Sequence, residues 1–322
     1  VCLIEDVRVD PAVLDDSQIA AFEVEARAAG NGLGRFWRIT SPAGKVSHLW
    51  GTLHASSPDI LRLPDALTDA IARARSVGVE FDPTSLTRTE LTRQFQAGDF
   101  YLKEGEQPYK SLDPRVRRWI EARLAGVGYG AGWLDAIHPA ALAEILLYHP
   151  CLDFSAGVLP VQDSHIQTLG VLAGARIVGL EPWHAFRDAM RQPVNLPIVL
   201  AIIETYGSLL SPDLPGEGHR TGLALYLQGR IGVMQAWDRA ATIEFFGKQK
   251  GGRLHDLMDG YLVAARNRGF AASAKPLLEE GDAVIAVGAF HLPGPDGLVS
   301  LFRNAGYRLE RIPVPGEIGA HR

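Results

Sequence analysis

The sequence predicts an α/β (α+β) fold, in which helices cover a mixed β-sheet core and helical insertions occupy the middle of the chain. Short apolar runs bounded by Gly and Pro recur near both ends, at residues 46–53, 77–79, 177–180 and 284–287. Segments with apolar residues at helical spacing lie between these runs, and from about residue 84 to 160 only helical patterns occur. Alternating strands and helices favour a twisted sheet covered by helices.

Composition narrows the class of protein. The chain has 322 residues, of which 47% are hydrophobic and 21% charged, a profile of a globular protein that buries a large core. Its net charge is −5, and no dense run of Lys and Arg could follow a phosphate backbone, so nucleic acid is excluded as a partner. No apolar run approaches the roughly 20 residues of a membrane span, so we expect no transmembrane segment.

The N-terminal residues 1–34 are predicted to form a helical extension, with a helix at 15–28 that the glycines of 30–34 end. Residues 35–322 are predicted as one domain with a helical insertion at about 84–160. The first residue is Val1, which favours an exported, periplasmic protein whose signal peptide has been removed; a cytoplasmic protein with a trimmed tag is the competing interpretation. Cys2 and Cys151 could pair in an oxidising compartment or both stay reduced.

From residue 35 onward, the first half of the chain reads as a hairpin followed by helices. Residues 35–40 alternate as a half-buried strand, and the turn 41–44 leads into the strand that ends at His54. A helix at 61–75 then precedes the strand that ends at Glu80. The insertion should contain helices at residues 86–97, 114–125 and 138–148.

The second half repeats the helix-strand pattern and adds long helices. A helix at 162–172 and a strand at 176–181, ending at Glu181, echo the unit at 63–80. The strand before His291 is followed by a helix at 298–304 and a strand at 307–312. The remaining helices are predicted at residues 183–203, 223–246, 254–270 and 271–280, with a loop at 211–218.

Four predicted strands thus end at His54, Glu80, Glu181 and His291, which are our candidate metal ligands and catalytic residues. Imidazole and carboxylate groups bind zinc, manganese, cobalt or iron, and three such ligands leave a position open for water. A remaining carboxylate could act as general base, so the set favours hydrolysis. The alternative is that each residue only caps a loop. For the whole set this is less favourable, because a buried carboxylate is destabilising unless it is paired or binds a cation.

Other patterns carry less chemistry. No Gly-x-Ser-x-Gly elbow, P-loop or His-Glu-x-x-His helix is present. The other histidines lack a strand-end position and are predicted on surfaces or helices, although His184 lies only three residues after Glu181; they are His48, His138, His149, His165, His184, His219, His255 and His321.

These residues resemble a known family. Gly51-Thr52-Leu53-His54, Val178-Gly179-Leu180-Glu181, Arg266-Asn267 and Val287-Gly288-Ala289-Phe290-His291-Leu292 are similar to motifs of the TraB/GumN group, which is similar to the TIKI metalloproteases. The resemblance covers about residues 36–312, with Asp163 and its helix before Glu181. It implies a mixed sheet related to erythromycin esterase-like and ChaN-like proteins. Pro182-Trp183-His184 departs from the pattern of many members, which affects substrate contacts more than metal binding.

The resemblance to TIKI proteins implies divalent-metal-dependent peptide cleavage with His54, His291 and either Glu80 or Glu181 at the centre. Together with the residue types, it predicts a metal-dependent hydrolase of peptides or small molecules that uses Mn, Co or Zn. One glutamate would be a ligand and the other the base. Two alternatives remain: an esterase-like hydrolase with His54 as metal-free base, and a protein that sequesters a peptide, haem or another small molecule without catalysis.

Arg266 is the last candidate. The predicted helix 254–270 buries one apolar face, and Arg266 lies next to that face. Its side chain could extend along the surface into solvent. Alternatively, its guanidinium could form bidentate contacts with Glu80, Glu181 or a substrate carboxylate, which a Lys could not reproduce.

Overall fold

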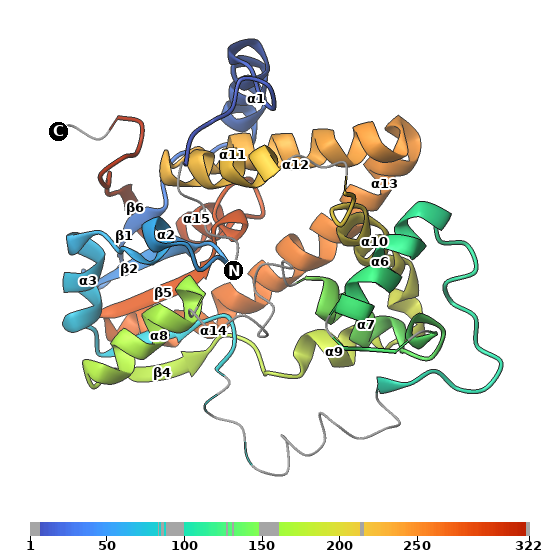
Figure 1. Cartoon of the computed structure of the whole chain (residues 1–322). Coiled ribbons are helices and arrows are strands. Elements are labelled where there is room, and N and C mark those ends of the chain that lie inside the picture. Colours follow the sequence, from blue (N-terminus) through green and yellow to red (C-terminus); the bar gives the residue numbers. More distant parts are fainter. Residues whose placement is uncertain are drawn as a thin grey trace.

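One mixed β-sheet organises the protein, as the sequence predicts. The structure is a computed structural model that describes residues 7–82, 84, 87, 100–126, 128–130, 132–147, 161–212 and 216–319. These residues form a six-stranded sheet flanked by helices, which confirms the α/β fold (Figure 1). Among them, no helix has the length and apolar character needed to cross a bilayer. Cys2, Cys151 and the predicted helix at 86–97 lie outside the described residues.

The sheet has a parallel part and an antiparallel part. The strand order is β4-β3-β5-β2-β1-β6, in which β4, β3, β5 and β2 run parallel, whereas β1 and β6 are antiparallel to their neighbours. The hairpin predicted around residues 41–44 is present. The strands are β1 (Phe36–Thr40), β2 (Val46–Thr52), β3 (Ser76–Val79), β4 (Arg176–Gly179), β5 (Ala283–Gly288) and β6 (Arg308–Arg311).

The parallel part is covered on both faces, which explains why its strands are largely apolar. Along the central strand β5, Ile285 and Val287 pack with α14 (Arg266–Glu280) and α15 (Leu298–Asn304). Val284 and Ala286 point the other way, into a core shared with α3 (Asp65–Ala72) and with α8 (Gln162–Leu172). The short helix α2 (Pro58–Leu61) lies between β2 and α3.

A separate helical core lies beside the sheet. Figure 1 shows the sheet on one side of the molecule and these helices on the other. Helices from the predicted insertion share this core with helices that come later in the chain, so the core is wider than residues 84–160. Its members are α6 (Pro114–Gly126), η2 (Trp133–Asp135), α7 (Pro139–Leu146), α9 (Ala185–Met190), α10 (Leu196–Ser208) and α13 (Lys248–Asp259).

Two predicted helices are broken in the structure. The helix predicted at 183–203 is interrupted at Gln192, whose extended backbone (ψ 128°) precedes Pro193 and the 3₁₀ turn η5 (Pro193–Asn195). A residue before proline is disfavoured in the helical region, which explains this break. The helix predicted at 223–246 is divided into α11 (Gly216–Leu227) and α12 (Ile231–Phe246) by Gly229, whose φ of 69° ends α11.

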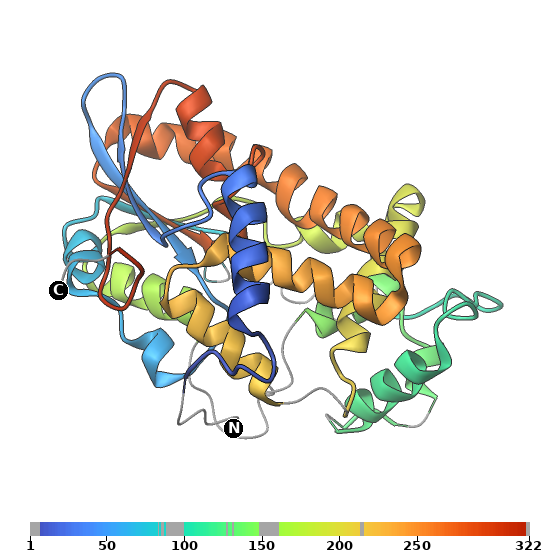
Figure 2. The ribbon, with the colours of Figure 1, turned by 90° about the horizontal axis from the view of Figure 1, so that it is seen from above.

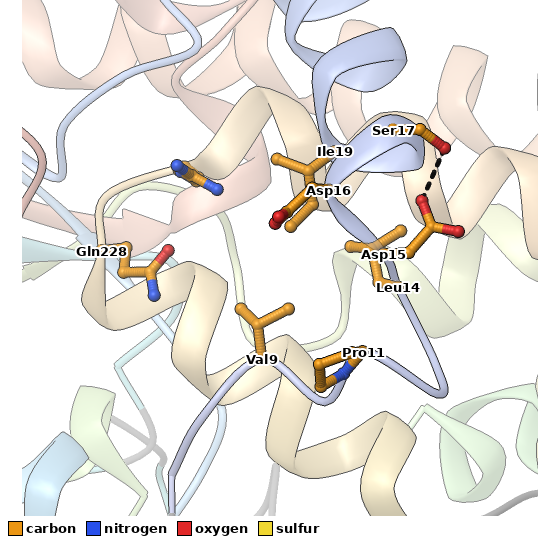
Figure 3. Close-up of a pocket in the computed structure, with 9 residues that line it drawn as sticks. Val9, Pro11, Leu14, Asp15, Asp16, Ser17, Ile19 and Gln228 are labelled. Atoms are coloured by element: carbon orange, nitrogen blue, oxygen red, sulfur yellow. Dashed lines mark hydrogen bonds between the residues drawn. The ribbon is translucent and has the colours of Figure 1, made fainter.

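The N-terminal helix α1 (Asp16–Ala29) packs on α12. Asp15 begins α1 with a capping box, in which its side chain accepts from the Gln18 backbone and the Gln18 side chain accepts from the Asp15 backbone. A hollow of about 550 Å³ lies between the segment before α1 and the residues that join α11 to α12 (Figure 3). Asp15 and Asp16 both line this hollow, and the Asp15 carboxylate is already used in the cap.

One long helical stretch connects the helical core to the sheet. The helix α13 continues through η6 (Gly260–Ala265), a π-helical segment, into α14. Figure 2 shows this stretch in orange, running from the helical core to the sheet. The predicted helices at 254–270 and 271–280 are therefore parts of one continuous helical stretch. Arg266 and Asn267 follow the π-helical segment directly.

Candidate functional site

Four parallel strands end beside one another at the same edge of the sheet. The order β4-β3-β5-β2 places Glu181, Glu80, His291 and His54 along this edge, each just past the carboxyl end of its strand. Ligands of open α/β sheets bind at such edges. All four residues line one cleft of about 680 Å³. The structure thus brings together the four strand-end residues that the sequence singled out.

His54 is oriented by Asp163, in the first turn of α8. Its Nδ1 lies 2.8 Å from Asp163 Oδ2, and Thr52 donates to the other carboxylate oxygen at 2.6 Å. Because a carboxylate accepts, Nδ1 carries the proton and Nε2 faces the cleft. The Asp163 charge raises the pKa of His54 to about 9 against the opposing effect of burial, and Glu80 adds to the increase. Solvent reaches 53% of the side chain.

His291 follows β5 in the 3₁₀ turn η7 (Ala289–His291) and is oriented by Asn267. The Asn267 amide nitrogen donates to the carbonyls of His291 and Asp296 at 3.1 and 2.9 Å. Its oxygen therefore faces His291 Nδ1, 2.7 Å away, so Nδ1 donates and Nε2 is left with a lone pair. Burial lowers the pKa of His291 to about 4, although Glu80 opposes this shift. The ring is neutral at physiological pH.

Glu80 lies between the two histidines and is 6% exposed. Its Oε1 accepts the Gly288 backbone N–H at 2.7 Å and lies 3.7 Å from His291 Nε2, while Oε2 accepts from Arg266 Nη2 at 2.7 Å. Burial alone would raise the pKa of Glu80. The charge of Arg266 and the nearby imidazoles outweigh this effect and, with the Gly288 N–H, hold the pKa well below its usual value. Glu80 is therefore an ionised carboxylate in a largely dry setting.

Gly288 has no side chain, so a space stays open where His54, Glu80 and His291 meet. A Cβ atom at this position would lie 3.1 Å from Glu80 Oε1, 3.5 Å from His291 Cδ2 and 3.8 Å from His54 Nε2. The backbone here is at φ −49°, which other residues also adopt, so the glycine is required for room and not for its conformation. Two imidazole edges and one carboxylate oxygen thus surround the space in front of Gly288.

Arg266 joins the carboxylates of β3 and β4. Its Nε donates to both oxygens of Glu181 at 3.1 and 3.2 Å, and its Nη2 donates to Glu181 as well as to Glu80. Burial would lower the pKa of Arg266, but the two glutamates raise it, so the guanidinium stays charged. In the structure the Arg266 side chain reaches the strand ends and does not extend into solvent.

These groups could hold a divalent cation. Among the described residues, ligand atoms of His54, Glu80 and Asp163 lie within 4.8 Å of one another. Imidazole with carboxylate is a donor set suited to Zn, Mn or Co. His291 Nε2 lies next to this group, 3.7 Å from Glu80 Oε1. Both Glu181 oxygens, in contrast, already accept hydrogen bonds from Arg266. The sequence did not assign site roles to Asp163 and Asn267, because an Asp in a first helical turn and an Asn on a helix are ordinary features by themselves.

The remaining histidines lie in varied settings. His48 stacks on Phe36 at a centroid distance of 5.3 Å, and burial lowers its pKa to about 4. His184 is 56% exposed and lies 3.6 Å from Asp188. His255 is on a helix, as predicted, and also lines the cleft, near Asp238. His149 and His321 lie outside the described residues.

One protein family model covers the sheet and its strand ends. The family model of TraB/PrgY/gumN proteins matches residues 35–311. This chain belongs to that family. The match begins one residue before β1 and ends with β6, so in this TraB/PrgY/gumN protein the family region contains the whole sheet and every site residue described above. No curated protein and no solved structure matches the chain.

Gln162 is a buried side chain that links two elements of the site. Its side chain is 1% exposed; Oε1 accepts from Trp50 Nε1 and the Leu53 backbone, and Nε2 donates to the Ile60 carbonyl. It thereby ties the end of β2 to the start of α8, next to both members of the His54–Asp163 pair. Tyr226 contacts the same oxygen through its hydroxyl, at 2.8 Å.

We predict that Gln162→Leu destabilises the fold by about 3 kcal/mol, because it leaves several buried partners unsatisfied. It should also lower the pKa of His54 by loosening its contact with Asp163. Denaturant unfolding and NMR titration of the His54 ring measure the two effects. Gln167→Leu is the matched control on α8, where one hydrogen bond to Asp82 is lost, for about 1 kcal/mol. Equal losses in the two variants would contradict the prediction.

Asp238 also lines the cleft; its backbone carbonyl accepts from Thr242, but among the described residues no hydrogen bond or ion pair reaches its carboxylate. Burial raises its pKa, although His255 opposes the shift. A raised carboxyl pKa means that the folded state binds the proton more tightly than the unfolded state, so the group destabilises the fold above its folded pKa. We predict that Asp238→Asn raises the melting temperature by a few degrees at pH 7 and leaves it unchanged near pH 3. Exposed Asp69→Asn is the control, and an equal gain there at pH 7 would reject the explanation.

Proposed function

We propose that this protein is a divalent-metal-dependent hydrolase of peptide bonds, with His54, Glu80 and His291 as ligands of Mn, Co or Zn. The observation that carries the proposal is the convergence of two imidazole edges and an ionised carboxylate on the space in front of Gly288. The grouping of His54, Glu80 and Asp163 atoms within 4.8 Å supports it. The resemblance to TIKI metalloproteases is the reason for choosing peptides.

The partners of the histidines fit metal ligation. Each Nδ1 is hydrogen-bonded to a side-chain oxygen, from Asp163 for His54 and from Asn267 for His291. Ligating histidines commonly have such partners, which fix the ring and leave Nε2 for the metal. A bound divalent cation would supply Lewis acidity and lower the pKa of a coordinated water. Asp163 would then orient His54, and it could itself become a ligand with a small movement.

The other two charged residues would handle substrate and protons. Glu181 Oε1 accepts hydrogen bonds from both Nε and Nη2 of Arg266, whereas Oε2 accepts only from Nε and so retains a lone pair that can take a proton from water. We assign Glu181 the role of general base and Glu80 that of ligand. Arg266 holds the two carboxylates apart in a fixed geometry. It could bind a substrate oxygen with the N–H groups that the glutamates leave free.

A metal-free esterase mechanism is less compatible with the site. It would require a neutral His54 to accept a proton, whereas Asp163 raises the pKa of His54 to about 9. This shift favours the protonated imidazole, which accepts no further proton. A cation at Nε2 would displace that proton.

Metal analysis tests the proposal. We expect the purified protein to bind one divalent ion and to lose at least tenfold affinity in both His54→Ala and His291→Ala, because each removes a ligand. His184→Ala is the matched control, since its ring is 56% exposed, close to the 53% of His54, and lies outside the cluster. Unchanged affinity in both ligand variants would contradict the metal site. Incubation of a peptide library with Mn²⁺, Co²⁺ or Zn²⁺, read by mass spectrometry, then tests cleavage; binding without cleavage would support the sequestering alternative.

Arg266→Lys tests the guanidinium separately from the metal. An ammonium group cannot bridge two carboxylates in a plane, so we expect activity to fall by about 100-fold while metal content persists and the melting temperature changes by only a few degrees. Arg268→Lys, on the same helix and 62% exposed, should retain activity. Full activity of the Arg266→Lys enzyme would remove Arg266 from the mechanism.

A further inference from the structure

Two aromatic rings stand beside the site carboxylates. Phe81 directly follows Glu80, and Trp183 lies two residues after Glu181, so the neighbouring strands β3 and β4 deliver both rings to the cleft. Their centroids are 5.1 Å apart with an interplanar angle of 68°, an edge-to-face pair. The pair therefore forms part of the cleft wall next to the proposed reaction centre.

Among the described residues, these rings take no part in the hydrophobic clusters of the fold. Both are only partly buried, and neither is a member of a hydrophobic cluster formed by the described residues. Large aromatic side chains usually contribute to a core, and those that line a cleft instead present apolar surface to a ligand. Phe186 lines the same cleft and adds to this apolar surface.

The charges nearby restrict which side chain could lie on the pair. The three carboxylates of Glu80, Glu181 and Asp163 outnumber the charges of Arg266 and protonated His54, so without a bound cation this end of the cleft keeps an excess of negative charge. A substrate carboxylate would be repelled there, whereas an uncharged ring or a branched aliphatic group would gain contact area without electrostatic opposition.

We propose that Phe81 and Trp183 form a specificity subsite for an aromatic or large aliphatic side chain next to the cleaved bond. This inference rests on the proposed peptide hydrolysis for its choice of ligand. The two rings follow the carboxylates by one and two residues, so a side chain on the pair belongs to a residue close to the reacting carbonyl. Trp183 and Phe81 are thus specificity residues and take no part in proton transfer.

The test uses matched peptides that differ at one position, which is Phe, Leu, Ser or Asp. With metal present, kcat/KM for the Phe and Leu peptides should exceed that for Ser by about 10- to 100-fold, and Asp should be poorest. Trp183→Ala should reduce the preference about tenfold, mainly through KM, and Trp183→Phe should restore it. The control is Trp133→Ala, which removes a ring stacked on Tyr129 at 4.1 Å outside the cleft lining and should leave the preference unchanged. An undiminished preference in Trp183→Ala would overturn the subsite.

Binding of the same peptides in EDTA, measured by calorimetry, separates the two proposals. If no peptide is cleaved with any metal but the Phe peptide still binds about tenfold more tightly than the Ser peptide, and only Trp183→Ala loses this difference, hydrolysis is rejected and the subsite stands. If cleavage occurs while Phe and Ser peptides bind and react equally, hydrolysis stands and the subsite is rejected.

Discussion

The burial of the Glu80 carboxylate is the constraint around which the cleft is arranged. A buried ionised carboxylate is strongly destabilising unless charges and hydrogen bonds compensate it. The compensation comes from separate parts of the chain: the Gly288 N–H at the end of β5, the Arg266 guanidinium on α14 and the charged His54 ring after β2. Each of these contacts also fixes a candidate site residue. The interactions that compensate the buried charge of Glu80 therefore also hold the site residues in place.

Local sequence patterns predicted the elements well but, apart from the hairpin of β1 and β2, did not predict their order in the sheet. The helix α8 has the predicted bounds, and all six strands coincide with predicted ones, because apolar runs and Gly or Pro boundaries are local signals. The breaks at Gln192 and Gly229 were missed since an apolar periodicity continues across them. The order β4-β3-β5-β2 depends on packing between distant segments, which no single run of residues encodes.

The site shows the same difference between what local patterns predict and what depends on contacts between distant segments. The residue types at four strand ends indicated His54, Glu80, Glu181 and His291, and parallel strands then placed them at one edge. Asp163 is 109 residues from His54, and Asn267 is 24 residues from His291, so their hydrogen bonds exist only in the folded chain. Residues that orient a reactive group have no local signature, whereas the reactive group itself does.

The π-helical segment η6 explains how Arg266 and Asn267 reach the site. The helix α13 buries Leu254 and Met258 in the helical core, while α14 buries Phe270 and Leu277 in the sheet core, so one helical stretch serves two cores. A π-helical turn closes with i→i+5 hydrogen bonds and so turns the residues after it relative to those before. The change of phase occurs between Gly260 and Ala265, immediately ahead of Arg266. The wider turn thus aims the guanidinium at Glu80 and the Asn267 amide at His291 while both flanking helices remain packed.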